Sequence, residues 1–217
     1  ALALESAKLQ QASLAQQRLQ QDLNLAQEIQ KSFLPSALPS TQELSFVAEY
    51  RPAYSVGGDF YDVFWLSRSQ IGCVIGDVSG KGVSAALLMA RVSSDLRAAM
   101  LTESGPAAAL RRVNVELVAR GQHDIFVTAI ALVIDVPTRR VTLANAGHLP
   151  PYVRRAQDGD LLRIEEATSC PLGLFDTVTF EQTDVTLYRG DALVLSTDGV
   201  QEATSERGEQ FGFGRLE

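Results

Sequence analysis

Three acidic turns hold the residues of this sequence that are best suited to chemistry. They are centred on Asp59, Asp77 and Asp198, and each places a carboxylate close to glycine at the edge of a strand-like run. Glycine allows another group to approach the backbone closely. Carboxylates that converge repel one another unless a proton or a cation neutralises them, and oxygen ligands select Mg²⁺ or Mn²⁺ over zinc. The three turns therefore suggest a site for hard cations.

Each turn also has an ordinary structural explanation. Asp and Gly are common turn residues, and a lone Asp-Gly pair such as Asp198-Gly199 is usually only the end of a strand. Three such turns in one small domain favour the cation site, although they do not decide the question by themselves.

A phosphate-binding loop and a serine nucleophile are both excluded by spacing. The segment from Gly76 to Lys81 follows a strand-like run, but only three residues separate Gly76 from the Gly80-Lys81 pair. In addition, Gly82 stands where a nucleotide-binding loop needs Ser or Thr. The chain has no Gly-x-Ser-x-Gly elbow, so the serine hydrolase arrangement is absent as well.

Histidine and cysteine are too sparse for a zinc site. The chain has two histidines, His123 and His148, and two distant cysteines, Cys73 and Cys170. His148 lies in a turn at 145–151, where it could face a site, but a hydrogen-bonded structural role is the expectation from the sequence.

The elements that must position these turns mix strands with two consecutive helices. Helices are predicted at 83–101 and 106–120, and a hairpin turn at 137–140. Strands are predicted at 44–50, 60–66, 70–77, 126–135, 140–146, 178–187 and 191–198. Strands clustered on both sides of two adjacent helices favour a layered α+β fold over alternating βαβ units.

Residues 1–34 predict one long helix that ends before Pro35. They contain no Gly or Pro, and seven of ten heptad seam positions are apolar. This helix either lies on its own domain or forms a parallel coiled coil that links the domain to a sensor module. The second interpretation is favoured, and it predicts a homodimer through Leu9, Leu19 and Leu23.

Composition sets the outer limits on function. The 217 residues carry 19 basic and 26 acidic side chains, for a net charge of −7, without the basic excess typical of a nucleic-acid binder. No apolar run is long enough to span a membrane, and the two separated cysteines suit a reducing cytoplasm. We therefore expect a cytoplasmic protein with a helix at 1–34 and a domain at 35–217.

The motifs, taken in order, resemble the stage II sporulation protein E (SpoIIE)-type serine/threonine phosphatases of the metal-dependent protein phosphatase superfamily. The resemblance runs from residue 27 to the end of the chain. It rests on Gly-Gly-Asp-Phe-Tyr-Asp at 57–62, Gly-Asp-Val-Ser-Gly-Lys-Gly at 76–82, Phe-Val-Thr-Ala at 126–129, Asn-Ala-Gly-His at 145–148, Pro-Leu-Gly at 171–173 and Ser-Thr-Asp-Gly-Val at 196–200.

This resemblance implies an α-β-β-α sandwich of two mainly antiparallel sheets flanked by helices, with two Mn²⁺ or Mg²⁺ ions at one edge. When the family's metal ligands are matched to this sequence residue by residue, the resemblance implies that Asp77 bridges both metals and that Asp59 supports one of them. The Val78 backbone carbonyl is implied to coordinate a metal as well. Asp198 binds the other metal. The implied reaction is hydrolysis of phosphoserine or phosphothreonine by a metal-activated water.

Residues outside the ligand set are implied less directly. Asp62, Ser79 and His148 are candidates for the surroundings of the metals; Ser79 stands where eukaryotic relatives carry a candidate general acid, a histidine. Arg51 is not equivalent to the relatives' phosphate-binding arginine. The last metal ligand of the family lies in an Asp-Asp-x-Thr strand, which we expect beyond residue 217 together with a final helix and strand.

The leading hypothesis is thus a regulated phosphatase that acts on a phosphorylated STAS-type anti-sigma-factor antagonist in a bacterial partner-switching pathway. The helix would carry a signal from a sensor or receiver domain of the same parent chain. Because one metal ligand is missing from this sequence, the alternative is a non-catalytic pseudophosphatase or scaffold that binds the partner without turnover. A coiled-coil adaptor would leave the acidic turns unexplained.

Overall fold

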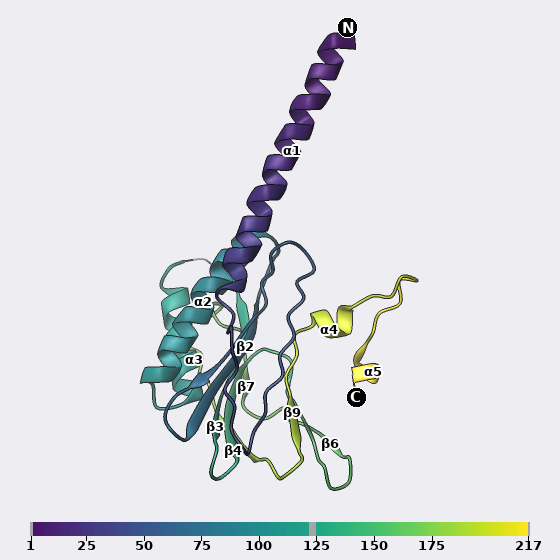
Figure 1. Ribbon diagram of the computed structural model, residues 1–217. Helices are drawn as coiled ribbons and strands as arrows, with labels where there is room; N and C mark the ends of the chain where they lie inside the picture. The colour runs from purple at the N-terminus through teal and green to yellow at the C-terminus, as the bar shows by residue number, and fades with distance from the viewer. Residues whose placement is uncertain (1, 122–124, 217) are drawn as a thin grey trace.

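A computed structural model describes residues 2–121 and 125–216, so His123 lies outside the described residues (Figure 1). The long first helix, α1 (Leu2–Lys31), projects from a layered body of sheets and helices (Figure 1). Across the described ranges, no helix is both long enough and apolar enough to cross a membrane.

The body is organised around a six-stranded sheet in which nearly all neighbours are antiparallel. Its path runs β1-β2-β3-β4-β7, and β8 also pairs with β4; the β4–β7 contact is the parallel one. The strands are β1 (Phe60–Trp65), β2 (Gln70–Val78), β3 (Val127–Asp135), β4 (Arg140–Ala146), β7 (Thr168–Ser169) and β8 (Thr183–Thr186). The expected hairpin at 137–140 joins β3 to β4, and the Asp135 carboxylate accepts a hydrogen bond from the Thr138 backbone N–H at 3.1 Å.

A smaller antiparallel sheet lies against this large sheet. It has the order β6-β5-β9 and consists of β5 (Tyr152–Arg154), β6 (Leu161–Arg163) and β9 (Ala192–Val194). Two further helices follow β9 along the chain, α4 (Gly199–Glu202) and α5 (Phe213–Leu216), each four residues long.

The two faces of the large sheet differ most on β3 and β4. There the helix-facing side presents four alanines, Ala129, Ala131, Ala144 and Ala146, while β1 and β2 add the larger Phe60, Phe64 and Val74 to the same face. The side facing the small sheet presents Ile130, Leu132, Val141 and Leu143, which pack with Val153 of β5. Small residues let helices approach closely, while the larger ones fill the space between two sheets. The expected α+β sandwich is confirmed.

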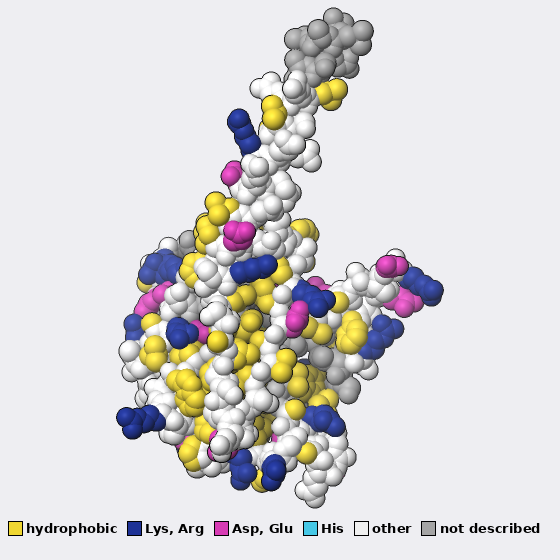
Figure 2. Space-filling view, viewed as in Figure 1, with side chains coloured by type: hydrophobic (Ala, Val, Ile, Leu, Met, Phe, Trp, Pro, Cys, Tyr) yellow, Lys and Arg dark blue, Asp and Glu magenta, His cyan; other side chains and the backbone are white. Residues whose placement is uncertain are grey.

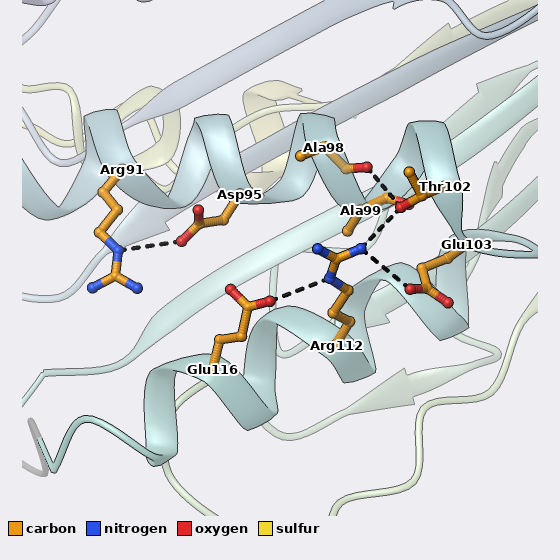
Figure 3. A network of polar contacts seen from close by, with 8 residues as sticks. All are labelled: Arg91, Asp95, Ala98, Ala99, Thr102, Glu103, Arg112 and Glu116. Carbon is orange, nitrogen blue, oxygen red and sulfur yellow. Dashed lines mark hydrogen bonds and ion pairs between the residues drawn. The ribbon is translucent and has the colours of Figure 1, made fainter.

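Helices α2 (Val83–Thr102) and α3 (Pro106–Val118) cover the alanine-rich face as a pair. Arg112 of α3 joins their ends, because its Nη1 donates to Oγ1 of Thr102 at 2.9 Å and lies 3.4 Å from the Glu103 carboxylate (Figure 3). Its Nε also pairs with Glu116 at 3.2 Å. Contacts this exposed add little stability each, so the helix pair is held mainly by its buried apolar face.

From Leu9 onward, the part of α1 that contacts the body is its C-terminal end. Residues 9–22 of the helix are exposed, whereas Leu23 and Ala26 are half-buried and Gln30 is only 5% exposed. Hydrophobic side chains are visible at several levels of the projecting helix (Figure 2). The helix ends at Lys31, four residues before Pro35, in agreement with the sequence expectation.

Several predicted strands were wrong or too long. Residues 44–50 form no strand; Leu44 and Phe46 still pack against the core between the sheets, so apolar alternation is present without backbone pairing. The strands expected at 178–187 and 191–198 shrink to β8 and β9. Strands β5, β6 and β7 were not predicted, because they have two or three residues each and are too short to show a period.

Candidate metal centre

The three acidic turns meet where the strands of the two sheets end. Asp59 immediately precedes β1, and Asp77 is the penultimate residue of β2, opposite Thr128 of β3. Asp198 follows β9 and occupies the N-cap position of α4. Two strands of the large sheet and one of the small sheet thus deliver the carboxylates to a shared neighbourhood, although the residues are far apart in sequence.

Gly58 explains how the first two turns come so close. A Cβ placed on Gly58 would lie 2.6 Å from the Val78 carbonyl oxygen and 2.9 Å from Oδ1 of Asp77. The Val78 N–H also donates to the Gly58 carbonyl at 3.3 Å. Any side chain at this position would push the Asp77 carboxylate and the Val78 carbonyl away from the turn that carries Asp59.

Burial, together with the charges of neighbouring carboxylates, raises the pKa values of Asp59 and Asp77. Burial, reinforced by the charges of Asp59 and Asp198, raises the pKa of Asp77 to about 7. Burial also raises the pKa of Asp59. Thr197 lowers this pKa in part, and the charge of Asp198 raises it further. Holding these carboxylates together in their charged form therefore costs free energy, and a bound cation would lower that cost by neutralising their charge.

The donor set fits a hard cation. It consists of carboxylates and the Val78 carbonyl, and Oδ1 of Asp59 is buried without a hydrogen-bond partner among the described residues. The carboxylates stand farther apart than the ligands of a bound metal ion do. Within residues 2–121 and 125–216, no three Asp, Glu, His or Cys side chains are grouped tightly enough to hold a metal ion. The cluster has the chemistry of a hard-cation site in an open arrangement.

Asp62 is not brought into this cluster. Its side chain is buried on the helix-facing side of β1, where its Oδ2 accepts a hydrogen bond from Nη1 of Arg97 on α2 at 2.6 Å. The Arg97 guanidinium also lies over the Phe64 ring, 4.3 Å from its centroid. Asp62 therefore links β1 to α2 and is not part of the candidate metal centre.

Ser79 and His148 occupy structural positions next to the cluster. The Ser79 hydroxyl accepts from the Phe126 N–H at 2.9 Å, and the Ser79 N–H donates to the Phe126 carbonyl at 2.9 Å, so this residue fastens the end of β2 to the start of β3. His148 is buried, and its Nδ1 lies 2.8 Å from Oγ1 of Thr128. Burial lowers the pKa of His148 to about 4, and the imidazole is therefore neutral at neutral pH.

Four residues around the cluster were not identified from the sequence. Gln30 of α1 holds the Gly57 backbone, and Thr197 bonds to Asp59. The Tyr50 hydroxyl and the Glu202 carboxylate both lie within electrostatic range of Asp77. Glu202 is four residues after Asp198 on α4, a spacing that places both on one helix face and that was available as a signal. The other contacts join distant segments and leave no local pattern.

The raised pKa of Asp77 predicts a pH-dependent stability in the absence of metal. Its folded-state pKa of about 7 exceeds the ordinary value of 3.8, so its contribution to stability is fully present only below about pH 4 and is lost as the pH rises from there through about 7. In EDTA, wild type and Asp77→Asn should melt nearly together near pH 4. Near pH 8 the wild type should melt lower by about 3 °C, or about 1 kcal/mol after allowance for solvent screening. Calorimetry that finds the same difference at both pH values would contradict this.

Comparisons with known proteins agree with the fold and the motifs. Residues 67–217 match the family model described as stage II sporulation protein E (SpoIIE). Among solved structures, the SiaA-PP2C domain of Pseudomonas aeruginosa superposes with a TM-score of 0.75 at 23% identity, over 93% of this chain and 81% of that one. At this identity the likeness shows the fold.

Curated relatives extend the similarity to nearly the whole chain. Protein IcfG of Synechocystis sp. is 31% identical over 90% of this chain and 35% of its own length. Phosphoserine phosphatase RsbU of Bacillus subtilis is 28% identical over 89% of this chain and 57% of its own length. The chain thus spans between about a third and just over half of these relatives. With most of its length matched by the family model, the chain belongs to the stage II sporulation protein E (SpoIIE) family.

Proposed function

We propose that this chain contains the catalytic domain of a metal-dependent serine/threonine phosphoprotein phosphatase. The observation that carries the proposal is the convergence of Asp59, Asp77 and Asp198 in one strained acidic cluster with an unpaired buried carboxylate oxygen. In this proposal residues 35–217 are the phosphatase domain, residues 1–34 are a signalling helix, and the protein works in the cytoplasm.

The roles of the chain's own groups follow from their positions. Asp77 would hold both of two Mn²⁺ or Mg²⁺ ions, the Val78 carbonyl and Asp59 would complete one side, and Asp198 would hold the other side. Two such ions supply charge neutralisation for the phosphoryl oxygens and lower the pKa of a water toward neutrality. Thr197 lowers the raised pKa of the Asp59 carboxylate, and Gly58 leaves room for the ligands to meet. No described serine or histidine is needed as a nucleophile.

The proposed substrate is a phosphoserine or phosphothreonine on a STAS-type anti-sigma-factor antagonist. Support comes from family membership and from similarity to a relative whose name is phosphoserine phosphatase RsbU. A sensor or receiver domain in the parent chain would set the activity through α1. Gln30 offers a route for this, because its Nε2 donates to the Gly57 carbonyl at 2.7 Å and its Oε1 accepts from the Gly57 N–H at 3.0 Å. A movement of α1 would thus pull on the turn that carries Asp59.

The test is release of inorganic phosphate from a phosphorylated STAS-type protein, with an aryl phosphate as a second substrate. Release that requires added Mn²⁺ or Mg²⁺ and stops in EDTA is expected. Release from the aryl phosphate alone would support the chemistry and overturn the substrate assignment. If a parent chain that includes the Asp-Asp-x-Thr segment releases no phosphate from either substrate, the assignment of phosphatase activity is overturned.

A non-catalytic scaffold is the second candidate, and one observation favours it. Within residues 2–121 and 125–216, the carboxylates stand too far apart to enclose a metal ion. A scaffold of this kind would bind the phosphorylated partner with the same affinity in Mn²⁺ and in EDTA, and it would leave the phosphate in place. Calorimetric titration with the phosphoprotein separates it from the enzyme.

Dimerisation through α1 remains a proposal with its own prediction. Leu9 and Leu19 on the projecting part are 69% and 60% exposed, while Leu23 is already half-buried against the body. Apolar side chains at heptad spacing favour a two-stranded coil. We expect a dimer at micromolar concentration that Leu19→Asp converts to a monomer, measured by sedimentation; Arg18→Asp, one position off the seam, is the matched control. If the wild type sediments as a monomer at micromolar concentration, the coiled-coil proposal is contradicted.

A further inference from the structure

Tyr50 is a buried polar group that the proposed chemistry leaves unused. It lies in the segment between α1 and β1, and its hydroxyl is buried without a hydrogen-bond partner among the described residues. A phenol has one proton to donate and normally finds a partner when buried. The missing partner therefore requires an explanation.

The surroundings of this hydroxyl belong to the acidic cluster. A Cβ placed on Gly57 would lie only 2.9 Å from Oη of Tyr50, so the hydroxyl abuts the turn that leads into Asp59. After burial itself, the charges of Asp59 and Asp77 are the largest influences on the phenol, and together they raise the pKa of Tyr50 to about 12. The hydroxyl consequently stays protonated and remains a donor throughout the working range of pH.

An acceptor without a partner lies in the same neighbourhood. Oδ1 of Asp59 is also buried and unpaired among the described residues, while Thr197 bonds to the Asp59 carboxylate. A carboxylate has about four lone-pair sites, so Asp59 can accept from Thr197 and from a second donor while it ligates a cation. An unpaired donor and an unpaired acceptor thus lie beside the same glycine turn.

We propose that Tyr50 is a positioning residue of the metal centre, whose hydroxyl donates a hydrogen bond to the Asp59 carboxylate when the centre is loaded. This inference rests on the proposed function, because it assigns Asp59 as a metal ligand. The hydrogen bond fixes the orientation of the carboxylate and removes the unpaired donor and acceptor together. Groups that orient a ligand in this way typically change metal affinity by 10- to 100-fold.

The experiment compares the wild-type chain with Tyr50→Phe and with Tyr188→Phe as the matched control. Tyr188 is 63% exposed and packs with Arg155, 5.5 Å from its ring centroid. Each protein is titrated with Mn²⁺ by calorimetry, and its near-ultraviolet tyrosine difference spectrum is recorded as Mn²⁺ is added. Melting in EDTA checks that each variant folds.

In wild type and Tyr188→Phe, Mn²⁺ should bind equally and produce a tyrosine difference band. In Tyr50→Phe, the Kd for Mn²⁺ should rise about tenfold and the band should disappear. Wild-type affinity in Tyr50→Phe, or a band that persists in it, would overturn the role of Tyr50 and leave the phosphatase proposal standing. If the wild type binds Mn²⁺ without any tyrosine band, Tyr50 is excluded even if its variant does not fold. If the wild type binds no Mn²⁺ even as the parent chain that includes the Asp-Asp-x-Thr segment, both proposals fall.

Discussion

Asp77→Asn should lower metal-dependent phosphate release at least about a hundredfold. Asp77 is the most perturbed of the clustered carboxylates, with burial and the charges of Asp59 and Asp198 raising its pKa to about 7. Asparagine keeps the shape of the side chain but removes the charge that neutralises a cation. A metal's charge stabilisation of the transition state is worth several kcal/mol, and each 1.36 kcal/mol is tenfold in rate.

The loss should be specific to catalysis and metal binding. Removing a repelled carboxylate does not weaken the metal-free fold, so Asp77→Asn should melt at or above the wild-type temperature in EDTA at neutral pH. Asp160→Asn, at an exposed turn between β5 and β6, is the matched control and should keep full activity. Phosphate release by Asp77→Asn within a few-fold of wild type would remove Asp77 from the centre.

Gly58→Ala is expected to have the second-largest effect. The added methyl would lie 2.6 Å from the Val78 carbonyl oxygen and 2.9 Å from Oδ1 of Asp77, closer than side chains pack against backbone. The turn before Asp59 must therefore move away from β2, which separates the ligands that the centre needs together. We expect the Kd for Mn²⁺ to rise at least about tenfold, and the free energy of unfolding to fall by about 1–3 kcal/mol from overpacking.

Gly214→Ala provides the matched glycine control. A Cβ at Gly214 meets open space and its φ is ordinary, so the substitution should change stability by less than about 0.5 kcal/mol and leave Mn²⁺ binding intact. Calorimetric titration of both variants measures the difference. Equal Mn²⁺ affinity in Gly58→Ala and wild type would show that the approach of Gly58 to Val78 has no bearing on metal binding.

The sequence was most informative where residues act locally. The strands around Asp59 and Asp77 and the helix pair α2–α3 were predicted, because long alternating or helical patterns and glycine turns are properties of neighbouring residues. The convergence of Asp59, Asp77 and Asp198 could be suspected only from the set of motifs. The structure brings them together, and their role as ligands stays a prediction.

The rest depends on contacts between distant segments. Gln30 occupies one of the polar positions of the heptad seam, and its amide holds the Gly57 backbone 27 residues away. Asp62 sits in an acidic motif beside Asp59, yet strand alternation turns it to the opposite face of β1, where Arg97 neutralises it. Residues 44–50 have the apolar alternation of a strand and lack the backbone partner that would make one.

Anomalous diffraction at the manganese edge, from crystals of the protein grown with Mn²⁺, tests the central claim most directly. We expect a manganese peak about 2–2.5 Å from the Asp77 carboxylate and the Val78 carbonyl oxygen, with Asp59 and Asp198 drawn toward it. Crystals that hold Mn²⁺ elsewhere on the molecule and none within ligand distance of Asp77 would contradict it.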